Sequence, residues 1–222
     1  MNSAAYILSR VDHTLLRPEA SADDIRLLCA EAKRWHTASV CVNPCHVPLA
    51  ASLLRDSGVA VCTVVGFPLG ACASSCKAFE AAQAAEDGAA EYDMVIPIGA
   101  LKSGDFKTVE KDIAAVRGAV DGVLKVIVEA CLLTPREKRL ACDIVCASGA
   151  DYIKTSTGFS AGGATFEDVA LFAECCRGRC RVKAAGGISS IHDMERFIAL
   201  GADRLGTSRA IRLFEEAGAL PE

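Results

Sequence analysis

The sequence lacks the long apolar runs, export signals and charge bias that mark membrane, secreted and nucleic-acid-binding proteins. It contains no run of about 18 apolar residues, so no transmembrane helix is predicted. The N-terminal residues do not join a basic segment to a long apolar one, and we expect no signal peptide. The formal net charge of −4 comes from interspersed acidic and basic residues, which argues against a nucleic-acid or membrane surface. We therefore expect a cytoplasmic protein.

Recognisable metal and redox motifs are also missing, although the chain has 12 cysteines. There is no CxxC, and the four histidines show neither HxH nor HExxH spacing. Cysteine pairs four residues apart occur at 41/45, 72/76 and 142/146. The last pair falls in a predicted helix over 135–149, where two thiols could bind a metal, but packing as small apolar residues is the simpler interpretation. Since the chain is large and lacks an export signal, we expect reduced cysteines and no structural metal.

The sequence does contain a regular alternation of apolar, strand-like runs and helical segments. Eight strands are predicted, at 11–16, 38–43, 59–66, 91–97, 123–130, 151–157, 181–186 and 203–208. Eight helical stretches lie between and after them. Ser21 and Asp24 are expected to cap the first of these helices, and Gly88 to end another.

Eight βα units with continuous apolar strands indicate a parallel sheet covered by helices. About 220 residues suit a single (β/α)₈ TIM barrel, which we expect to span residues 1–222 as one domain. A doubly wound open sheet is the alternative fold. Against it, no GxGxxG follows the first strand, and the chain shows no division into two halves.

Charged residues interrupt these apolar strands. They are Asp12, Asp93, Lys125, Glu129, Lys154 and Lys183. A buried charge is costly unless it is compensated, and one such residue alone is most simply half of a structural ion pair. Three lysines and two aspartates from five strands indicate instead a site at the C-terminal mouth of the barrel, where the chemistry of this fold collects. Strand parity places Lys125 and Glu129 on the same face.

The amine of a lysine can attack a carbonyl carbon and form a Schiff base, provided that the amine is neutral. Apolar surroundings and a second cation both favour the neutral amine, so Lys154 and Lys183 together suit carbonyl chemistry. The glycine-rich stretches STGFSAGG, AAGGI and RLGTS follow the last three strands, where this fold often binds phosphate through backbone N–H groups. Such glycines also mark plain turns. The residues predict a barrel enzyme that forms a Schiff base with a phosphorylated carbonyl compound.

Several motifs together resemble the deoxyribose-phosphate aldolases, from residue 11 to residue 209. They include DHTLL, SVCVNP, EYDMVIP, LKVIVE, YIKTSTGF and VKAAGG. The resemblance implies a class I aldolase that needs no cofactor and is often a homodimer. Its substrates would be a sugar phosphate and aldehydes: it would reversibly cleave 2-deoxy-D-ribose 5-phosphate to D-glyceraldehyde 3-phosphate and acetaldehyde, in deoxynucleoside catabolism.

The resemblance also implies roles for individual residues. Lys154 matches the Schiff-base lysine, Lys183 the second lysine that tunes it, and Asp93 the aspartate of a proton relay. Asp12 and Lys125 match a supporting ion pair. Positions matched to the substrate and phosphate pocket are Cys41, Thr157, Gly158, Gly186, Gly187, Gly206 and Ser208.

One departure from the family and two rival functions bear on these expectations. Many relatives end in a tyrosine that assists proton transfer, whereas the last tyrosine here is Tyr152, which puts a tail-assisted step in doubt. A different Schiff-base barrel aldolase is one rival. A non-catalytic sugar-phosphate-binding protein is the other, but it would be expected to have lost Lys154 or Asp93, and both are present.

Overall fold

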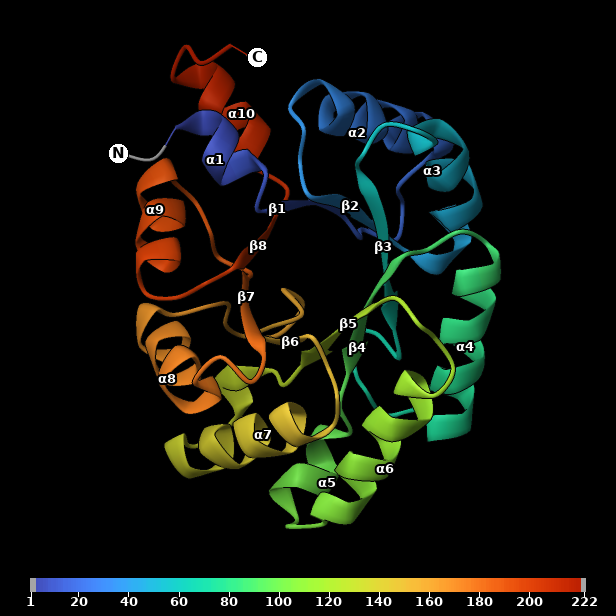
Figure 1. The fold of residues 1–222 in the computed structure, drawn as a ribbon, viewed down its shortest axis with the longest axis vertical. Helices are drawn as coiled ribbons and strands as arrows, with labels where there is room; N and C mark the ends of the chain where they lie inside the picture. The colour runs from blue at the N-terminus through green and yellow to red at the C-terminus, as the bar shows by residue number, and fades with distance from the viewer. Residues whose placement is uncertain (1–2, 221–222) are drawn as a thin grey trace.

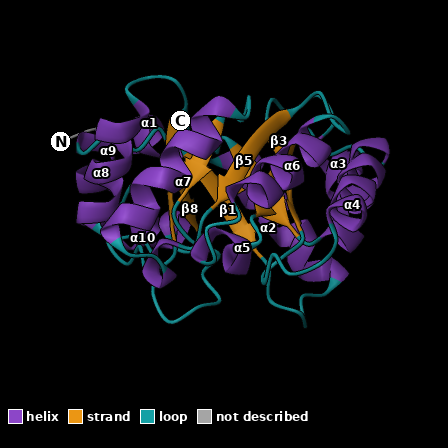
Figure 2. Cartoon of the chain, turned by 90° about the horizontal axis from the view of Figure 1, so that it is seen from below, coloured by secondary structure: helices purple, strands orange, loops and turns teal. Residues whose placement is uncertain are grey.

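The computed structural model describes residues 3–220, which form a closed barrel of parallel strands surrounded by helices (Figure 1, Figure 2). Each strand pairs with the next along the chain, and β8 closes the barrel against β1. The strands are β1 Val11–Leu15, β2 Ser39–Val42, β3 Ala60–Val65, β4 Glu91–Val95, β5 Val123–Ile127, β6 Tyr152–Lys154, β7 Arg181–Ala185 and β8 Arg204–Thr207. All eight predicted strands are present, which confirms the predicted TIM barrel.

Helices connect the strands and form the outer layer. They are α1 Ala4–Leu8, α2 Ala22–Arg34, α3 Val47–Leu54, α4 Ser74–Glu86, α5 Ile98–Lys102, α6 Phe106–Arg117, α7 Pro135–Ala147, α8 Phe166–Cys176, α9 Ile191–Ala199 and α10 Ala210–Glu216, with 3-10 turns η1 Pro44–His46 and η2 Ala130–Leu132. The short helices α1 and α5 are not predicted from the sequence, because five residues are too few for a periodic pattern. Within residues 3–220, no helix is both long and apolar enough to cross a bilayer.

The predicted helix boundaries rest on side-chain and backbone caps. The Ser21 hydroxyl accepts the backbone N–H of Asp24, and the Asp24 carboxylate accepts the backbone N–H of Ser21. These two bonds satisfy N–H groups that have no partner inside helix α2. Gly88 follows the end of α4 with a φ of 105°, a conformation that favours glycine. Both predicted caps are confirmed.

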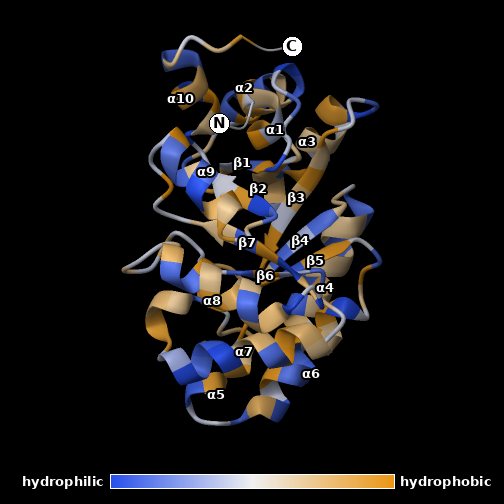
Figure 3. Cartoon of the chain, turned by 60° about the vertical axis from the view of Figure 1, so that its left-hand side comes forward, coloured by the Kyte–Doolittle hydropathy of each residue, from blue (hydrophilic) through white to orange (hydrophobic). Residues whose placement is uncertain are grey.

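Apolar side chains fill the layer between the barrel and the helices. Ile25 and Leu28 of α2, Phe172 of α8 and Phe197 of α9 are buried in one continuous cluster that also includes the outward-facing strand residues. Coloured by hydropathy, helices such as α7 and α8 alternate hydrophilic and hydrophobic segments, as expected of helices with one face on a core (Figure 3). Burial of the strands under these helices explains their continuous apolar runs.

The β5 strand ends earlier than its apolar run suggests. Glu129 has a left-handed backbone conformation with a φ of 51° and leads into the η2 turn. The chain therefore leaves the sheet after Ile127, and the prediction that Glu129 continues the alternation of β5 is wrong. Its carboxylate instead accepts a hydrogen bond from the Thr157 hydroxyl at 2.5 Å, which holds the loop after β6.

Candidate active site

Asp93, in the middle of β4, is the contact shared by all three strand lysines. Its Oδ2 lies 2.7 Å from Lys154 Nζ and 2.5 Å from Lys183 Nζ, and its Oδ1 lies 2.9 Å from Lys125 Nζ. The strand register brings these groups together, because Asp93 pairs with Lys125 and Lys154 pairs with Lys183 on neighbouring strands. All four side chains are buried inside the barrel.

Asp12 extends the network on the opposite wall. It accepts from Lys183 Nζ at 2.5 Å, from Arg204 Nη1 at 2.6 Å and from Ser39 Oγ at 2.7 Å. The expected pairing of Asp12 with Lys125 is present but long, at 3.6 Å. Lys183 is therefore the main lysine partner of Asp12, and this differs from the expected arrangement. The reason is barrel closure, which brings β1 beside β8 and near β7.

Two further charged residues complete the network, and the sequence analysis missed both. Glu91 lies 2.6 Å from Lys125 Nζ, and Arg204 lies between Glu91 and Asp12. Glu91 and Arg204 each lie near the start of a predicted strand. Glu91 is two residues before Asp93 and so shares its face, which is a signal that strand parity could have given.

The network holds two of its carboxylates and two of its lysines in their charged states. Burial disfavours the charge on Asp93 and Asp12, but the neighbouring lysines outweigh it and keep the pKa of each carboxyl below its usual value. Burial also disfavours the charge on Lys183 and Lys125, yet Asp93 and Asp12 raise the pKa of both ammonium groups above the usual value. These four groups are ionised at neutral pH.

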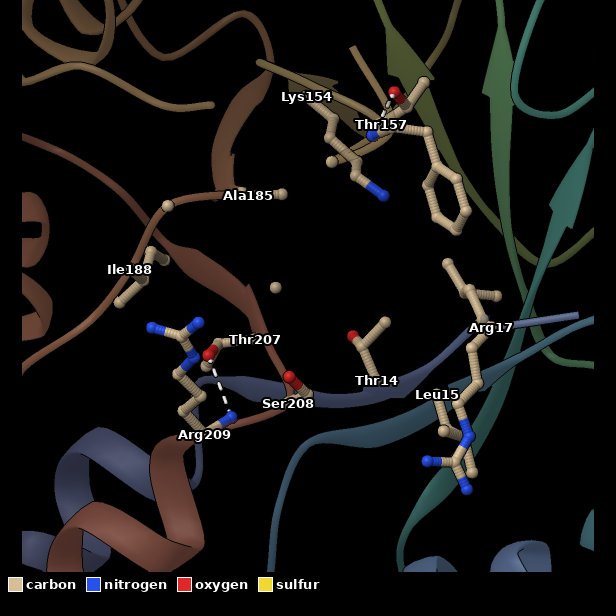
Figure 4. A pocket seen from close by; sticks show the side chains of 16 residues that line it. Thr14, Leu15, Arg17, Lys154, Thr157, Ala185, Ile188, Thr207, Ser208 and Arg209 are labelled. Carbon is tan, nitrogen blue, oxygen red and sulfur yellow. Dashed lines mark hydrogen bonds between the residues drawn. The ribbon is translucent and has the colours of Figure 1, made fainter. Parts of the chain in front are cut away.

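A cavity of about 450 Å³ opens above this network, at the C-terminal ends of the strands. Among the network's charged side chains, only Lys154 lines it; the others lie underneath. Figure 4 shows the Lys154 amine pointing into the space between Ala185, Thr14 and Ser208. The network is therefore asymmetric, since a molecule in the cavity meets Lys154 before any other lysine.

The predicted phosphate-pocket residues surround the same cavity. Those that line it are Thr157, Gly158, Gly186, Gly187, Gly206 and Ser208. They come from the loops after β6, β7 and β8, except Gly206, which lies within β8 itself. The Thr157 hydroxyl is already engaged, because it donates to Glu129 and accepts the backbone N–H of Phe159. The cavity is also lined by Phe159, Arg17 and Arg209, which the sequence analysis did not single out.

Close backbone packing explains part of the glycine content. A side chain at Gly163 would have its Cβ only 2.4 Å from the backbone of Gly186, so the loops after β6 and β7 touch through glycine. The backbone N–H of Ala164 donates to the carbonyls of Ala185 and Gly186 at this contact. Gly187 has a φ of 76° and open space beside its Cα. It is therefore Gly163 that packing requires to be glycine.

Cys41 lies near the network rather than on the cavity wall. It is fully buried, and its register partner on β3 is Cys62. The Cys62 thiol lies 3.3 Å from Asp93 and 3.2 Å from Lys125, so the pair fills the space beside the carboxylate. Cys41 and Cys62 could reach a metal ion together with Asp93. However, Asp93 already accepts from three ammonium groups, which would repel a cation there.

Comparisons with known proteins agree with this geometry. Residues 6–210 match the model of the DeoC/LacD family of aldolases. The chain belongs to this family. It is 50% identical over 220 residues to a deoxyribose-phosphate aldolase of Carboxydothermus hydrogenoformans, covering 97% of this chain and 96% of the relative. It is 53% identical over 206 residues to one of Finegoldia magna, covering 92% and 97%.

Solved aldolases share the fold of this family member. A putative deoxyribose-phosphate aldolase of Coccidioides immitis superposes with a TM-score of 0.95 at 39% identity, covering 98% of this chain and 88% of the other. A deoxyribose-phosphate aldolase of Aeropyrum pernix, described as having a unique tetrameric structure, gives 0.89 at 32% identity, covering 98% and 93%.

The charged network predicts how stability depends on pH. Asp12 and Asp93 have lowered pKa values, so their contribution is complete above the unfolded value of about 3.9 and is lost as the pH falls below it. Lys183 and Lys125 have raised pKa values, and their contribution persists until the pH exceeds about 10.4. We expect the free energy of unfolding, from urea titrations, to be nearly constant from about pH 5 to 9 and to fall on the acid side.

Asp12→Asn provides the comparison for this prediction. The variant should be less stable at neutral pH, because Lys183 and Arg204 lose a buried partner. Its free energy of unfolding should also fall less steeply at acid pH, since one carboxylate with a lowered pKa is gone. A fall as steep as that of the wild-type protein would contradict the assignment of this slope to Asp12.

Proposed function

We propose that the protein catalyses the reversible cleavage of 2-deoxy-D-ribose 5-phosphate to D-glyceraldehyde 3-phosphate and acetaldehyde, through a Schiff base on Lys154 and without a metal cofactor. The observation that carries the proposal is the position of Lys154. Within residues 3–220, Lys154 is the only lysine on a strand that lines the cavity. Its amine contacts the buried carboxylate of Asp93. The substrates named for the relatives support this choice of reaction.

The network contains more cations than carboxylates. Within residues 3–220, four cations of the network face three carboxylates: Lys125, Lys154, Lys183 and Arg204 against Asp12, Glu91 and Asp93. An uncompensated buried charge is costly. Arginine stays charged, and the carboxylates around Lys125 and Lys183 hold both as cations. Lys154 differs from both, because it contacts only Asp93 among these carboxylates and faces the cavity.

The neutral amine of Lys154 then attacks C1 of the open-chain sugar. Loss of water gives an iminium ion, which draws electrons from the C2–C3 bond once the C3 hydroxyl gives up its proton. Breaking that bond releases D-glyceraldehyde 3-phosphate and leaves an enamine on Lys154. Protonation at C2 and hydrolysis release acetaldehyde. The iminium serves as the electron acceptor, which is the part a Lewis-acid metal would otherwise play.

Asp93 and Lys183 are placed to move the protons of this sequence. Asp93 contacts Lys154 directly and can take and return a proton as the carbinolamine forms and loses water. Lys183 shares the same carboxylate oxygen and supplies a fixed positive charge beside it. Asp12 and Lys125 then act as supports: Asp12 orients Lys183, and Lys125 holds the other oxygen of Asp93.

The loops after the last three strands would hold the phosphate group. Gly158, Gly186, Gly187, Gly206 and Ser208 line the cavity, and the four glycines leave backbone exposed there. Backbone N–H groups in such loops bind phosphate oxygens without a counter-charge. Thr157 shapes this wall through its bond to Glu129, and Cys41 is buried in the barrel beside Cys62. Arg17 and Arg209 add positive charge at the rim.

We further propose that residues 1–222 form one catalytic domain that acts in the cytoplasm as a homo-oligomer. A dimer remains our prediction. Of the relatives compared, the Aeropyrum pernix enzyme is described as tetrameric.

Borohydride trapping tests the nucleophile. With acetaldehyde present, reduction should convert the imine into a stable secondary amine, so Lys154 should carry an ethyl group in a peptide mass map. Lys154→Met should remain unlabelled. Labelling of Lys183 or Lys125 in the wild-type protein would contradict the assignment, and a failure to release acetaldehyde from deoxyribose phosphate would contradict the substrate.

The pH–rate profile of Lys183→Leu tests the role of the second lysine. Both amines contact one carboxylate oxygen, so we take them to be about 5 Å apart, where a fixed charge at an effective dielectric near 20 costs about 3 kcal/mol. We expect kcat/KM of the variant to be about 10²-fold lower at pH 7. Part of this loss should be regained toward about pH 9.5, because the higher pH itself then favours the neutral amine that attacks the substrate.

Lys125→Leu is the matched control, because Lys125 is equally buried and contacts the same aspartate through its other oxygen. It should lower activity with a smaller change in the pH dependence. A Lys183→Leu profile that superimposes on the wild-type profile would show that Lys183 does not set the charge state of Lys154.

Gly187→Val tests the phosphate site. Losing one or two charge-assisted hydrogen bonds, at roughly 1.5–3 kcal/mol each, should raise KM for deoxyribose phosphate by about tenfold or more. The effect on unphosphorylated deoxyribose should be smaller. Gly149→Val is the control, since Gly149 has the same backbone conformation, with a φ of 78°, and lies in the loop between α7 and β6, away from the cavity. Equal losses on both substrates would indicate that Gly187 serves only the turn.

A further inference from the structure

A cluster of cysteine thiols lies on the outside of the barrel, away from the cavity. Cys146 Sγ is 3.2 Å from Cys180 Sγ, and Cys180 Sγ is 3.5 Å from Cys176 Sγ. All three sulfur atoms lie within 4.8 Å of one another. The thiol of Cys142 contacts that of Cys176. Three of the chain's 12 cysteines therefore meet at one point, and a fourth adjoins one of them.

Two separate segments of the chain supply these thiols. Cys142 and Cys146 lie one helical turn apart on α7, and Cys176 is the last residue of α8. After α8, Arg177 and Gly178 adopt left-handed conformations and turn the chain so that Cys180 returns to Cys176. Helices α7 and α8 pack side by side (Figure 1), which brings the two pairs together.

We propose that this cluster is a binding site for one zinc ion, with Cys146, Cys176 and Cys180 as ligands and Cys142 as the fourth. Four thiolates in a tetrahedron are a common structural zinc site, with Zn–S bonds of about 2.3 Å. Such bonds imply sulfur–sulfur distances of about 3.8 Å. The Cys146–Cys180 separation of 3.2 Å and the Cys176–Cys180 separation of 3.5 Å need to widen only slightly, and Cys142 has to turn from Cys176 toward the ion. Each thiol releases its proton as the metal binds.

The surroundings of the cluster suit a soft cation held by thiolates. A zinc ion with four thiolates carries a net charge of −2, and two arginines flank the site. Arg139 donates to the neighbouring Cys175 thiol, and Arg179 donates to the carbonyl of Cys176. Cys142, Cys176 and Cys180 are buried, whereas Cys146 is partly exposed and gives the ion a path of entry.

The position of the site indicates a structural role. Cys180 immediately precedes β7, the strand that carries Lys183, and α7 leads into β6, the strand that carries Lys154. The cavity lies at the other end of these strands. A metal here would link α7, the helix before β6, to the start of β7. It would raise stability without contacting substrate.

A disulfide between Cys146 and Cys180 is the competing use of the same thiols. A disulfide needs only two thiols, whereas three are mutually close here and a fourth adjoins Cys176. The number of convergent thiols therefore favours the metal.

Titration with Co²⁺ and Zn²⁺ tests the site on the reduced, chelator-treated full-length protein. Co²⁺ should produce the intense visible absorption of tetrahedral thiolate coordination, saturate at one ion per chain, and be displaced by Zn²⁺. Cys146→Ser and Cys180→Ser should each weaken binding by about 10²-fold or more. Cys175→Ser is the matched control, because Cys175 adjoins Cys176 in the chain but lies outside the cluster, and it should bind as the wild-type protein does.

Thermal unfolding provides a second measurement. Free zinc at about a hundredfold excess over its Kd should raise Tm by about 5–10 °C in the wild-type protein and in Cys175→Ser, but not in Cys146→Ser. The rate of acetaldehyde release should be the same with and without the metal. No Co²⁺ absorption in the wild-type protein, or equal weakening in Cys175→Ser, would overturn the proposal. So would a zinc-free protein, purified without reductant, in which Cys146 and Cys180 form a disulfide.

Discussion

The Asp93 carboxylate, buried in the barrel and shared by three lysines, is the interaction on which the rest of the site depends. One oxygen receives Lys154 and Lys183, and the other receives Lys125. A carboxylate inside a protein is stable as an anion only when such partners replace water. Each lysine in turn needs the carboxylate, so the network holds together as a unit.

The network is arranged so that one lysine differs from the others. Lys125 and Lys183 are enclosed by two or more carboxylates and lie under the cavity floor, whereas Lys154 has Asp93 beneath it and the cavity above. The number of carboxylate partners and access to the cavity therefore distinguish Lys154 from two enclosed lysines of the same residue type. The barrel makes this possible, because parallel strands place side chains of matching register in one layer around a closed interior.

The two ends of the barrel carry different kinds of chemistry. At the C-terminal ends of the strands, glycine-rich loops leave backbone exposed around a cavity. At the N-terminal end of β7, thiols from α7 and from the turn after α8 converge outside the sheet. The thiol cluster and the cavity therefore lie at opposite ends of β6 and β7.

The sequence by itself determined the barrel and most of the site. The alternation of apolar strands and helices predicts the fold, because continuous apolar strands require cover on both faces, and the charged residues within those strands predict the lysines and aspartates of the network. Only the tertiary structure decided which charged residues form ion pairs with one another. Asp12 reaches Lys183 rather than mainly Lys125, and Arg204 joins the network, because closure of the barrel brings β1 beside β8. The Cys176–Cys180 pair likewise meets α7 only through helix packing, a contact between segments about 30 residues apart that no local periodicity encodes.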